Sequence, residues 1–150
     1  MGHTYANILI HVIFSTKERR PIIRPDFSER LREYLCGLAR QEFGKAIKVG
    51  GTADHMHGLI SLRTDIASSH AMSRWKSLST SWIRKTIAGA GEFAWQSGYG
   101  AFSVSPSNAD SVITYIASQP EHHARQTFQE EFIEFLRRHE VDFDPDHVWD

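Results

Sequence analysis

The sequence predicts an α+β protein of the ferredoxin-like type, in which a split βαβ (RRM-like) antiparallel sheet carries helices on one face and is followed by a C-terminal helix. Stretches rich in β-branched and aromatic residues alternate with stretches of helical periodicity in the order β-α-β-β-α-β-α, which is the split βαβ order. The two middle strands are close enough in the chain to pair as a hairpin. No repeat, low-complexity segment or linker interrupts this order. We therefore expect one domain over residues 1–150, with a core of about 4–125 and a C-terminal helix and tail at 126–150.

The first strand and the first helix are predicted near the N-terminus. The segment YANILIHVIFS, residues 5–15, predicts a strand that is buried on both faces. Asp26 and Glu29 have the spacing of a capping box, which indicates where the next helix begins. Apolar residues at helical spacing predict that helix over 27–43, and Gly44 ends it.

The middle of the chain predicts a hairpin and a second helix. The segments KAIKVGG (45–51) and HMHGLISL (55–62) are short strands with a brief connection, so we expect them to pair antiparallel. Residues 68–88 carry one apolar stripe at helical spacing. Trp75 and Trp82 lie on this stripe, so we expect them to pack in the core and not to stack on nucleic-acid bases.

A fourth strand and a third helix follow a glycine-rich loop. The segment GAFSVS, residues 100–105, predicts the strand, and Asn108 is expected to cap a helix over 109–119. Pro120 should interrupt this helix, because the residue before a proline disfavours the α conformation.

The C-terminal segment predicts a last helix with a tail. Thr127 and Glu130 form a second capping box, and the helix is expected to run to about Arg138. We expect the tail to pack back onto the domain through Phe143 and Trp149.

The composition is that of an ordinary globular protein without a membrane span. Hydrophobic residues make up 41% and charged residues 23% of the sequence. No apolar run approaches the roughly 18 residues that cross a bilayer, and the first residues lack the pattern of a signal peptide. The single cysteine, Cys36, cannot form an internal disulfide and is expected to fill space in the core. We therefore expect a cytoplasmic protein with no membrane partner.

The net charge of −1 hides an uneven distribution. Residues 121–150 contain nine acids and three bases, so residues 1–120 contain nine acids and fourteen bases. The bases gather in two segments, 17–24 and 66–91. A basic body with an acidic tail is typical of a nucleic-acid-binding protein, although solvated helix faces produce the same pattern.

Two histidines in one predicted strand are the first candidates for chemistry. His55 and His57 are two residues apart, so in a strand they project from the same face. Two imidazoles side by side can bind one metal ion. With nine histidines in 150 residues, such a pair also arises by chance. The pair alone therefore leaves metal binding and ordinary packing both open.

Tyr115 and Gln119 are the second pair of candidates. They are four residues apart in the third predicted helix and therefore lie on one face of it. A neutral tyrosine hydroxyl is a poor nucleophile, but it becomes effective when a bound cation polarises the group that it attacks. The carbonyl oxygen of Gln119 can serve as a third ligand to such a cation. The alternative is that Tyr115 packs against its apolar neighbours.

These residues lie in stretches that resemble a known family. The matching stretches occur in the order in which the family has them: IFSTKERRPI, DHMHGLISL, SRWKSLSTSWI, GYGAFSVS and YIASQPEHH. The last stretch, FIEFLRRHEVDFDPDHVWD, is similar to the tail of many members. The chain thus resembles the single-tyrosine transposases of the insertion-sequence-200-like type, a branch of the HUH endonucleases that includes the REP-associated tyrosine transposases.

The resemblance implies a metal-dependent nuclease and strand transferase that acts on single-stranded DNA with a hairpin. It assigns Tyr115 as the nucleophile that forms a 5′-phosphotyrosine. It assigns His55, His57 and Gln119 as ligands of Mg²⁺ or Mn²⁺. It also implies a homodimer, in which the tyrosine helix of one chain can complete the site of the other. A domesticated relative that processes REP elements is an alternative within the same family.

The chain departs from the family pattern next to the third ligand. Many members have asparagine before the glutamine and an acid after it, whereas Ser118 and Pro120 flank Gln119 here. The ligand is retained, but Pro120 can redirect the helix that follows. His122 and His123 lie beyond this point, and we expect them at the surface.

His11 and Asp54 are candidates for supporting roles. His11 lies in the first predicted strand and can approach the site. Asp54 precedes the histidine pair and can orient an imidazole by accepting a hydrogen bond from it. A strand histidine without a role and an ordinary turn residue are the alternatives.

Basic and aromatic residues outside this constellation are candidates for DNA contact. We expect phosphate contacts at Lys17, Arg19, Arg20, Arg74, Lys76 and Arg84, and base contacts at Tyr99 and Phe102. Two other functions stay open on the sequence. One is a catalytically silent RRM-like nucleic-acid-binding module, whose aromatic signature GYGAFSVS loosely echoes. The other is a metal-dependent phosphodiesterase that uses water as its nucleophile.

Overall fold

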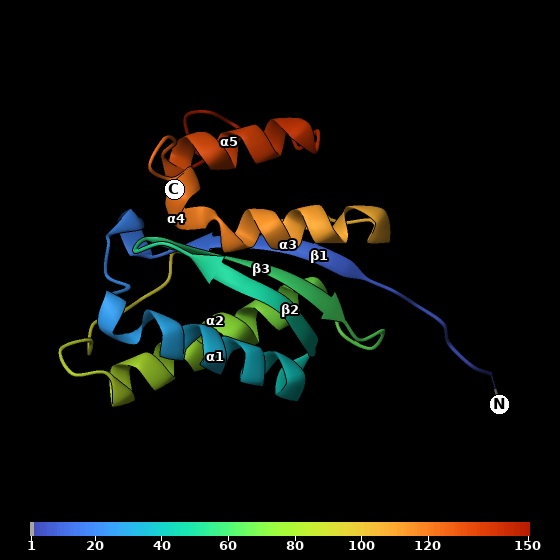
Figure 1. Ribbon diagram of the computed structural model, residues 1–150, viewed down its shortest axis with the longest axis horizontal. Coiled ribbons are helices and arrows are strands. Elements are labelled where there is room, and N and C mark those ends of the chain that lie inside the picture. Colours follow the sequence, from blue (N-terminus) through green and yellow to red (C-terminus); the bar gives the residue numbers. More distant parts are fainter. Residues whose placement is uncertain (1) are drawn as a thin grey trace.

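A four-stranded antiparallel sheet with the strand order β2-β3-β1-β4 organises the computed structural model, which describes residues 2–150 (Figure 1). The strands are β1 (Leu9–Ser15), β2 (Gly44–Gly51), β3 (His55–Leu62) and β4 (Gly100–Ser103). Two long helices, α1 (Pro25–Glu42) and α2 (Ser68–Thr86), cover one face of the sheet. The other helices, α3 (Ala109–Ala117), α4 (Gln119–His122) and α5 (Phe128–Arg138), lie on the opposite face. Within residues 2–150, none of the helices has the length and apolarity that crossing a membrane requires.

This architecture confirms the predicted ferredoxin-like fold. Helices α1 and α2 are the two helices of the split βαβ unit, and α5 is the additional C-terminal helix. The third predicted helix is divided in two, because α3 ends at Ala117 and α4 begins at Gln119. Pro120 explains the break, since it has no N–H to donate to the preceding turn.

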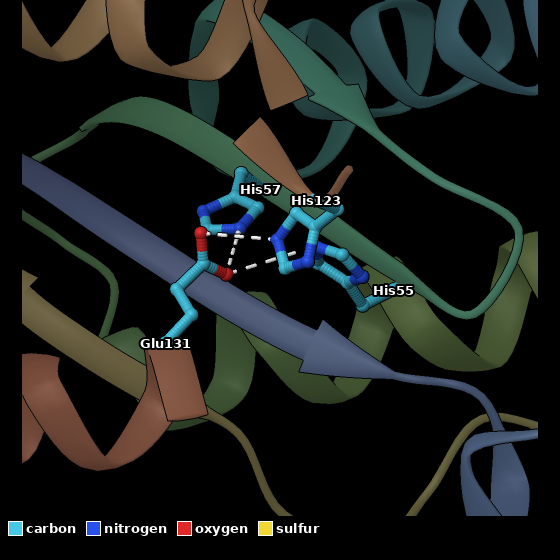
Figure 2. Close-up of side chains that lie close together, drawn as sticks. All are labelled: His55, His57, His123 and Glu131. Carbon is cyan, nitrogen blue, oxygen red and sulfur yellow. Dashed lines mark hydrogen bonds and ion pairs between the residues drawn. The ribbon is translucent and has the colours of Figure 1, made fainter. Parts of the chain in front are cut away.

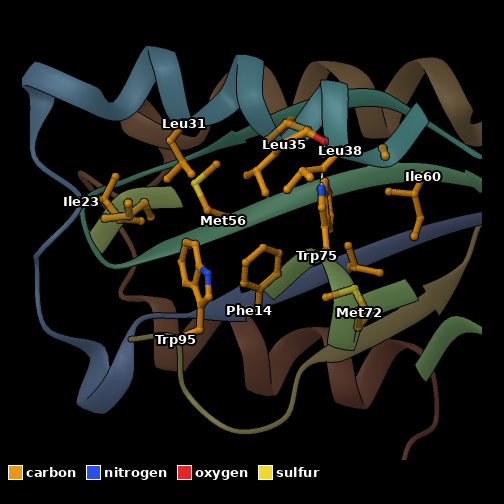
Figure 3. Packing of buried hydrophobic residues seen from close by; sticks show 14 of the residues in the cluster. Phe14, Ile23, Leu31, Leu35, Leu38, Met56, Ile60, Met72, Trp75 and Trp95 are labelled. Atoms are coloured by element: carbon orange, nitrogen blue, oxygen red, sulfur yellow. Dashed lines mark hydrogen bonds between the residues drawn. The ribbon is translucent and has the colours of Figure 1, made fainter. Parts of the chain in front are cut away.

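The main core lies between the sheet and helices α1 and α2 (Figure 3). Leu31 and Leu35 lie one turn apart on α1 and are fully buried. Trp75 on α2 is also fully buried, and its Nε1 donates a hydrogen bond of 2.9 Å to the carbonyl oxygen of Leu35. The packing role predicted for the two tryptophans is confirmed, because Trp82 stacks on Tyr34 with ring centroids 4.4 Å apart.

Two glycines allow a helix to pack closely against a strand of the sheet. A Cβ atom at Gly58 would lie 2.8 Å from Cη2 of Trp75, so this position of β3 has no room for a side chain. A Cβ atom at Gly50 would lie 2.5 Å from the carbonyl oxygen of Ile116. Glycine at position 50 therefore lets helix α3, which carries Tyr115, lie directly against strand β2.

Two predicted helix caps are wrong. Helix α1 begins at Pro25 with Arg24 as its N-cap, and no side chain caps it. Asp26 instead accepts hydrogen bonds from Nε and Nη2 of Arg24, at 2.9 and 3.1 Å, and does not form a box with Glu29. Asn108 precedes α3, but its side chain makes no capping bond, because a short 3₁₀ turn leads directly into the helix.

The C-terminal segment follows its prediction. Oγ1 of Thr127 accepts a hydrogen bond of 3.2 Å from the backbone N–H of Glu130, and α5 ends at Arg138. Phe143 and Trp149 pack into a second cluster under α5, which confirms that the tail folds back onto the domain.

Candidate active site and metal centre

Strand β3 places both histidines on the sheet face that α3 and α5 cover. The side chains of His55 and His57 are fully buried, whereas Met56 between them points into the main core. This alternation is the one expected of neighbouring residues in a strand. The two imidazoles therefore lie between the sheet and the C-terminal helices.

Helices α3 and α4 bring Tyr115 and Gln119 to these histidines. Oε1 of the buried Gln119 lies 3.0 Å from Nε2 of His55. The rings of Tyr115 and His57 have centroids 5.7 Å apart. The four residues that the sequence singles out for chemistry therefore share one place in the fold.

A carboxylate for which the sequence offers no motif contacts this group, and Figure 2 shows it beside the histidines. Glu131 on α5 is only 1% exposed, and its Oε1 lies 2.9 Å from Nε2 of His57. Its Oε2 accepts a hydrogen bond from the hydroxyl of Tyr115 and another, of 3.2 Å, from Nε2 of Gln119. Helix α5 thus closes the site with a buried negative charge.

His123 also belongs to the site, so its predicted place at the surface is wrong. Its side chain is 11% exposed, and its Nε2 lies 3.1 Å from Oε2 of Glu131 without the angles of a hydrogen bond. No atom of residues 2–150 makes a hydrogen bond to this buried nitrogen. The short helix α4 turns the chain back toward the sheet and carries His123 with it, while His122 stays 35% exposed.

The hydrogen bonds fix the charge of Glu131 and Tyr115. Burial opposes ionisation of Glu131, but the neighbouring His123 imidazole and hydrogen bonds from His57 and Tyr115 outweigh it and hold the pKa of Glu131 well below its usual range. Burial and the Glu131 carboxylate together raise the pKa of Tyr115 well above its usual value. At neutral pH, a neutral tyrosine hydroxyl therefore donates to an ionised carboxylate.

In both histidines of β3, the ring nitrogen Nδ1 has a hydrogen-bond partner. Nδ1 of His57 lies 2.8 Å from Nε2 of His11. Nδ1 of His55 lies 2.7 Å from Oδ1 of Asp54 and 2.9 Å from Oγ1 of Thr52. This arrangement turns Nε2 of each ring toward Glu131, and it is the support that metal-binding histidines usually have. The structure thus puts His11 and Asp54 where supporting residues would have to be.

The donor atoms fit a divalent cation. When Nδ1 of His55 donates a hydrogen bond to Asp54 and Nε2 carries no proton, Nε2 turns a lone pair toward Oε1 of Gln119. That oxygen is also an acceptor, so the two atoms cannot bond to each other. Two facing lone pairs and the unpaired nitrogen of His123 can all be satisfied by one cation. The ligand atoms of His55, His57, His123 and Glu131 lie within 4.8 Å of one another, so this buried cluster can bind a divalent metal.

The buried imidazoles predict a dependence of stability on pH. Burial lowers the pKa of His57 to about 4 and that of His11 to about 3. Both imidazoles take up a proton near pH 6.5 in the unfolded chain, so the unfolded state binds more protons between pH 6.5 and 4. Without metal, the free energy of unfolding should therefore fall as the pH drops through this window. A His11→Gln variant should flatten the dependence in urea unfolding, whereas a change of the exposed His70 to Gln should not. A slope that His11→Gln leaves unchanged would contradict this origin.

Two of the predicted phosphate contacts on α2, Lys76 and Arg84, donate hydrogen bonds to backbone carbonyl oxygens. Nζ of Lys76 donates hydrogen bonds of 2.5 and 2.6 Å to the carbonyl oxygens of Gln96 and Gly98, and Nε of Arg84 donates one of 2.7 Å to that of Phe93. These cations hold the loop that follows α2. Between helix and loop lies a groove of about 710 Å³ that both cations line, together with the exposed Lys85; none of its described lining residues is acidic.

The other predicted phosphate contacts lie at the surface or in ion pairs. Arg20 pairs with Glu18, Arg74 pairs with Glu42, Arg19 lies over the ring of Trp149, and Lys17 is exposed. The ion pair of Arg20 with Glu18 is exposed and therefore weak, so it leaves Arg20 available to a phosphate. These contacts stay predictions.

The base contact predicted at Phe102 is wrong. Phe102 is 4% exposed and packs under α5, where its ring centroid lies 5.5 Å from that of Phe135 and 4.6 Å from that of His139. Tyr99 is 38% exposed in the preceding loop and stays a candidate. Because α3 and α5 cover this sheet face, it also lacks the open surface that an RRM-like module uses.

Comparisons with known proteins agree with this fold and identify a family. The family model described as "Transposase IS200 like" matches residues 4–119. A crystal structure from Deinococcus radiodurans R1, described as a candidate transposase, matches with a TM-score of 0.62 at 19% identity and covers 79% of this chain and 96% of that chain. A structure of a REP-associated tyrosine transposase bound to a REP hairpin matches with a TM-score of 0.60 at 17% identity and covers 82% and 73%. A comparison with curated proteins gives no match.

The match to the family model defines the protein as a transposase. More specifically, the chain belongs to the IS200-like transposase family, whose model covers most of it.

Proposed function

We propose that the protein is a metal-dependent nuclease and strand transferase of single-stranded DNA and that Tyr115 is its nucleophile. One observation supports this more than any other. The hydroxyl of Tyr115 and Nε2 of His57 both contact the carboxylate of Glu131, and Nε2 of His55 lies 3.7 Å from it. The nucleophile and the candidate metal ligands therefore face one point.

The chemistry that this geometry suits is transesterification. Oη of Tyr115 attacks the scissile phosphorus, and the bond from phosphorus to the 3′-oxygen breaks. The phosphate stays on the protein as a 5′-phosphotyrosine, and the proton of the tyrosine ends on the leaving 3′-oxygen. Attack by another 3′-hydroxyl on the phosphotyrosine reverses the step and joins two strands, and no nucleotide cofactor is needed as an energy source. Glu131 orients the hydroxyl before the attack by accepting its hydrogen bond.

We propose that His55, His57 and Gln119 hold a divalent cation, with His123 and Glu131 beside them. Bound there, such a cation polarises the scissile phosphate and balances the charge that develops on it. Imidazoles suit transition ions better than Mg²⁺, so this donor set favours Mn²⁺ of the two metals expected. Glu131 supplies the one negative charge among these five groups.

A site completed within one chain is supported by the contacts. Tyr115, the three candidate ligands and Glu131 meet in a single chain, without a residue from a second copy. The homodimer stays a prediction from the family resemblance, and sharing of the tyrosine helix between copies is not needed to complete this site.

Hairpin-bearing DNA is the substrate that we propose, since one structural relative is a REP-associated tyrosine transposase bound to a REP hairpin. Covalent capture tests this function against its rivals. The protein is incubated with Mn²⁺ and an end-labelled single-stranded hairpin oligonucleotide, and then denatured in SDS. We expect a labelled protein–DNA adduct that EDTA prevents. Cleavage without an adduct would indicate water as the nucleophile, and binding without cleavage would indicate a silent binding module.

The groove along α2 predicts how DNA affinity depends on salt. Each phosphate contact lowers log K by roughly 0.7 to 0.9 per log unit of salt, so four contacts give a slope of about −3 to −4. Lys85 lines the groove and is exposed, and Arg40 on α1 is also exposed but lies outside it. Lys85→Ala should make the slope shallower by about 0.7 to 0.9, whereas Arg40→Ala should not, in fluorescence anisotropy from low to high salt. Equal slopes for the two variants would exclude the groove as the phosphate surface.

A further inference from the structure

An aromatic cavity next to the candidate active site has no part in the chemistry proposed above. It has a volume of about 310 Å³ and lies between the loop 96–99 and the C-terminal segment. Its aromatic lining includes Tyr99, Phe128, Phe132 and Trp149. The rings of Phe132 and Trp149 have centroids 5.9 Å apart, and those of Phe128 and Trp149 have centroids 6.4 Å apart. We call this cavity the Trp149 pocket.

One ring separates the Trp149 pocket from the candidate metal ligands. Phe128 lines the pocket and also stacks on His55, with ring centroids 4.7 Å apart and planes at 29°. A group in the pocket therefore lies one ring away from the place where the scissile phosphate is expected. A DNA strand that passes through the site can reach the pocket with the nucleotide next to that phosphate.

The charges around the Trp149 pocket indicate which part of a nucleotide enters it. Asp142 and Asp150 line the pocket, so a phosphate inside would meet negative charge. Arg19 lies over the ring of Trp149, with its Cζ 5.2 Å from the ring centroid, and offers a cation for a phosphate outside. An uncharged base suits the interior, because its flat face can stack on the aromatic rings and its amino groups can donate to the acids.

We propose that the Trp149 pocket binds one unpaired nucleobase next to the scissile phosphate, stacked against Trp149 and Tyr99. This inference rests on the proposed function and adds to it a binding site for the unpaired DNA beside the hairpin. The volume is at the lower end of the range for ligand pockets, which suits one base and not a base pair.

An abasic scan tests the pocket. Hairpin oligonucleotides with unpaired flanks are made with one base removed at a time, and their affinities are measured by anisotropy in EDTA, so that binding is separate from cleavage. With the unchanged protein, removal of one base beside the cleavage position should weaken binding roughly 5- to 150-fold, the effect of losing one stacked base. In Tyr99→Ala and Trp149→Ala, removal of that base should have no further effect. Tyr5→Ala is the matched control, because Tyr5 is 90% exposed and far from the pocket in the chain.

The outcomes separate the pocket from the proposed function. Tyr99→Ala could bind the hairpin and lose as much affinity on removal of each base as the unchanged protein does. That result would overturn the proposal that the Trp149 pocket binds a base, and it would leave the proposed function standing. No binding of any hairpin would overturn both. Self-association of the protein that Tyr99→Ala abolishes would show that a second copy fills the pocket, and it would also overturn the inference. Trp149→Ala can loosen the tail, so the decision rests on Tyr99→Ala, whose side chain is the more exposed of the two.

Discussion

A Tyr115→Phe variant is expected to bind the hairpin oligonucleotide as the unchanged protein does and to form no SDS-stable adduct with it. Phenylalanine keeps the ring, whose centroid lies 5.7 Å from that of His57 and 6.2 Å from that of His11, but it lacks the attacking oxygen. Removal of a covalent nucleophile costs on the order of 10⁶-fold in rate, so no adduct should be detected. The measurement is the rate of adduct formation under Mn²⁺, with DNA affinity measured separately in EDTA.

The control for this variant is Tyr34→Phe on α1. Tyr34 stacks on Trp82 at the opposite face of the sheet, so its hydroxyl has no access to the site, and the adduct should form as before. Tyr115→Phe also removes a hydrogen bond to the buried Glu131 carboxylate, which should lower the free energy of unfolding by about 1.5 to 3 kcal/mol. The variant must therefore be shown to be folded at the assay temperature. An adduct that persists in folded Tyr115→Phe would assign the nucleophile to another residue.

The order and type of the elements could be predicted because the signals are local. The alternating pattern of HMHGLISL fixes which side chains of β3 share a face, and the apolar spacing of α1 and α2 fixes which faces they bury. The side of the sheet that α3 covers is a different kind of fact. It depends on a close approach between Ile116 and Gly50, which are far apart in the chain, and no local pattern contains it.

The predictions that proved wrong depended on competition between partners. Asp26 has the spacing of a helix cap, but its carboxylate binds Arg24, two residues away, and the helix starts at Pro25 without a side-chain cap. Phe102 lies next to a loop with exposed residues, but as a strand residue it points to the face that α5 covers. In both cases the residue type was compatible with the prediction, but the side chain contacts a different partner, Arg24 for Asp26 and Phe135 for Phe102.

Only those residues of the candidate site that belong to a spacing motif could be predicted from the sequence. His55, His57, Tyr115 and Gln119 share faces of their own elements, and the structure brings these elements together. Glu131 and His123 lie in no such motif. The sequence did contain one signal for Glu131, since it lies three residues after Phe128 and four before Phe135, on the apolar stripe of α5. An acid on a buried stripe requires partners, and here they are His57, Tyr115 and Gln119.

The loss of metal binding in histidine variants is the second large effect that we expect. His57→Ala and His55→Ala each remove an imidazole whose Nε2 faces Glu131, and so should abolish both Mn²⁺ binding and cleavage while DNA binding remains. Replacing residues that merely support a metal ligand typically costs about 10- to 100-fold in affinity, so loss of a ligand should exceed about 100-fold. Calorimetric titration with Mn²⁺ measures this without any turnover of DNA. His70→Ala, a change of an exposed histidine on α2, is the matched control.

A graded series then separates ligands from supporting residues. Asp54→Asn and His11→Gln change the groups at Nδ1 of His55 and His57, so they should weaken Mn²⁺ binding by about 10- to 100-fold and leave the site able to bind metal at higher concentration. Gln119→Ala should have a milder effect than either histidine variant, because a neutral amide oxygen is the weakest of the three ligands. Glu131→Gln removes the negative charge that lies against His57 and His123, and should weaken binding as well, because that charge attracts the cation. Unchanged Mn²⁺ affinity in both His55→Ala and His57→Ala would leave the pair as ordinary strand residues. Stronger binding in Glu131→Gln would mean that this carboxylate competes with the metal for the histidines and does not bind it.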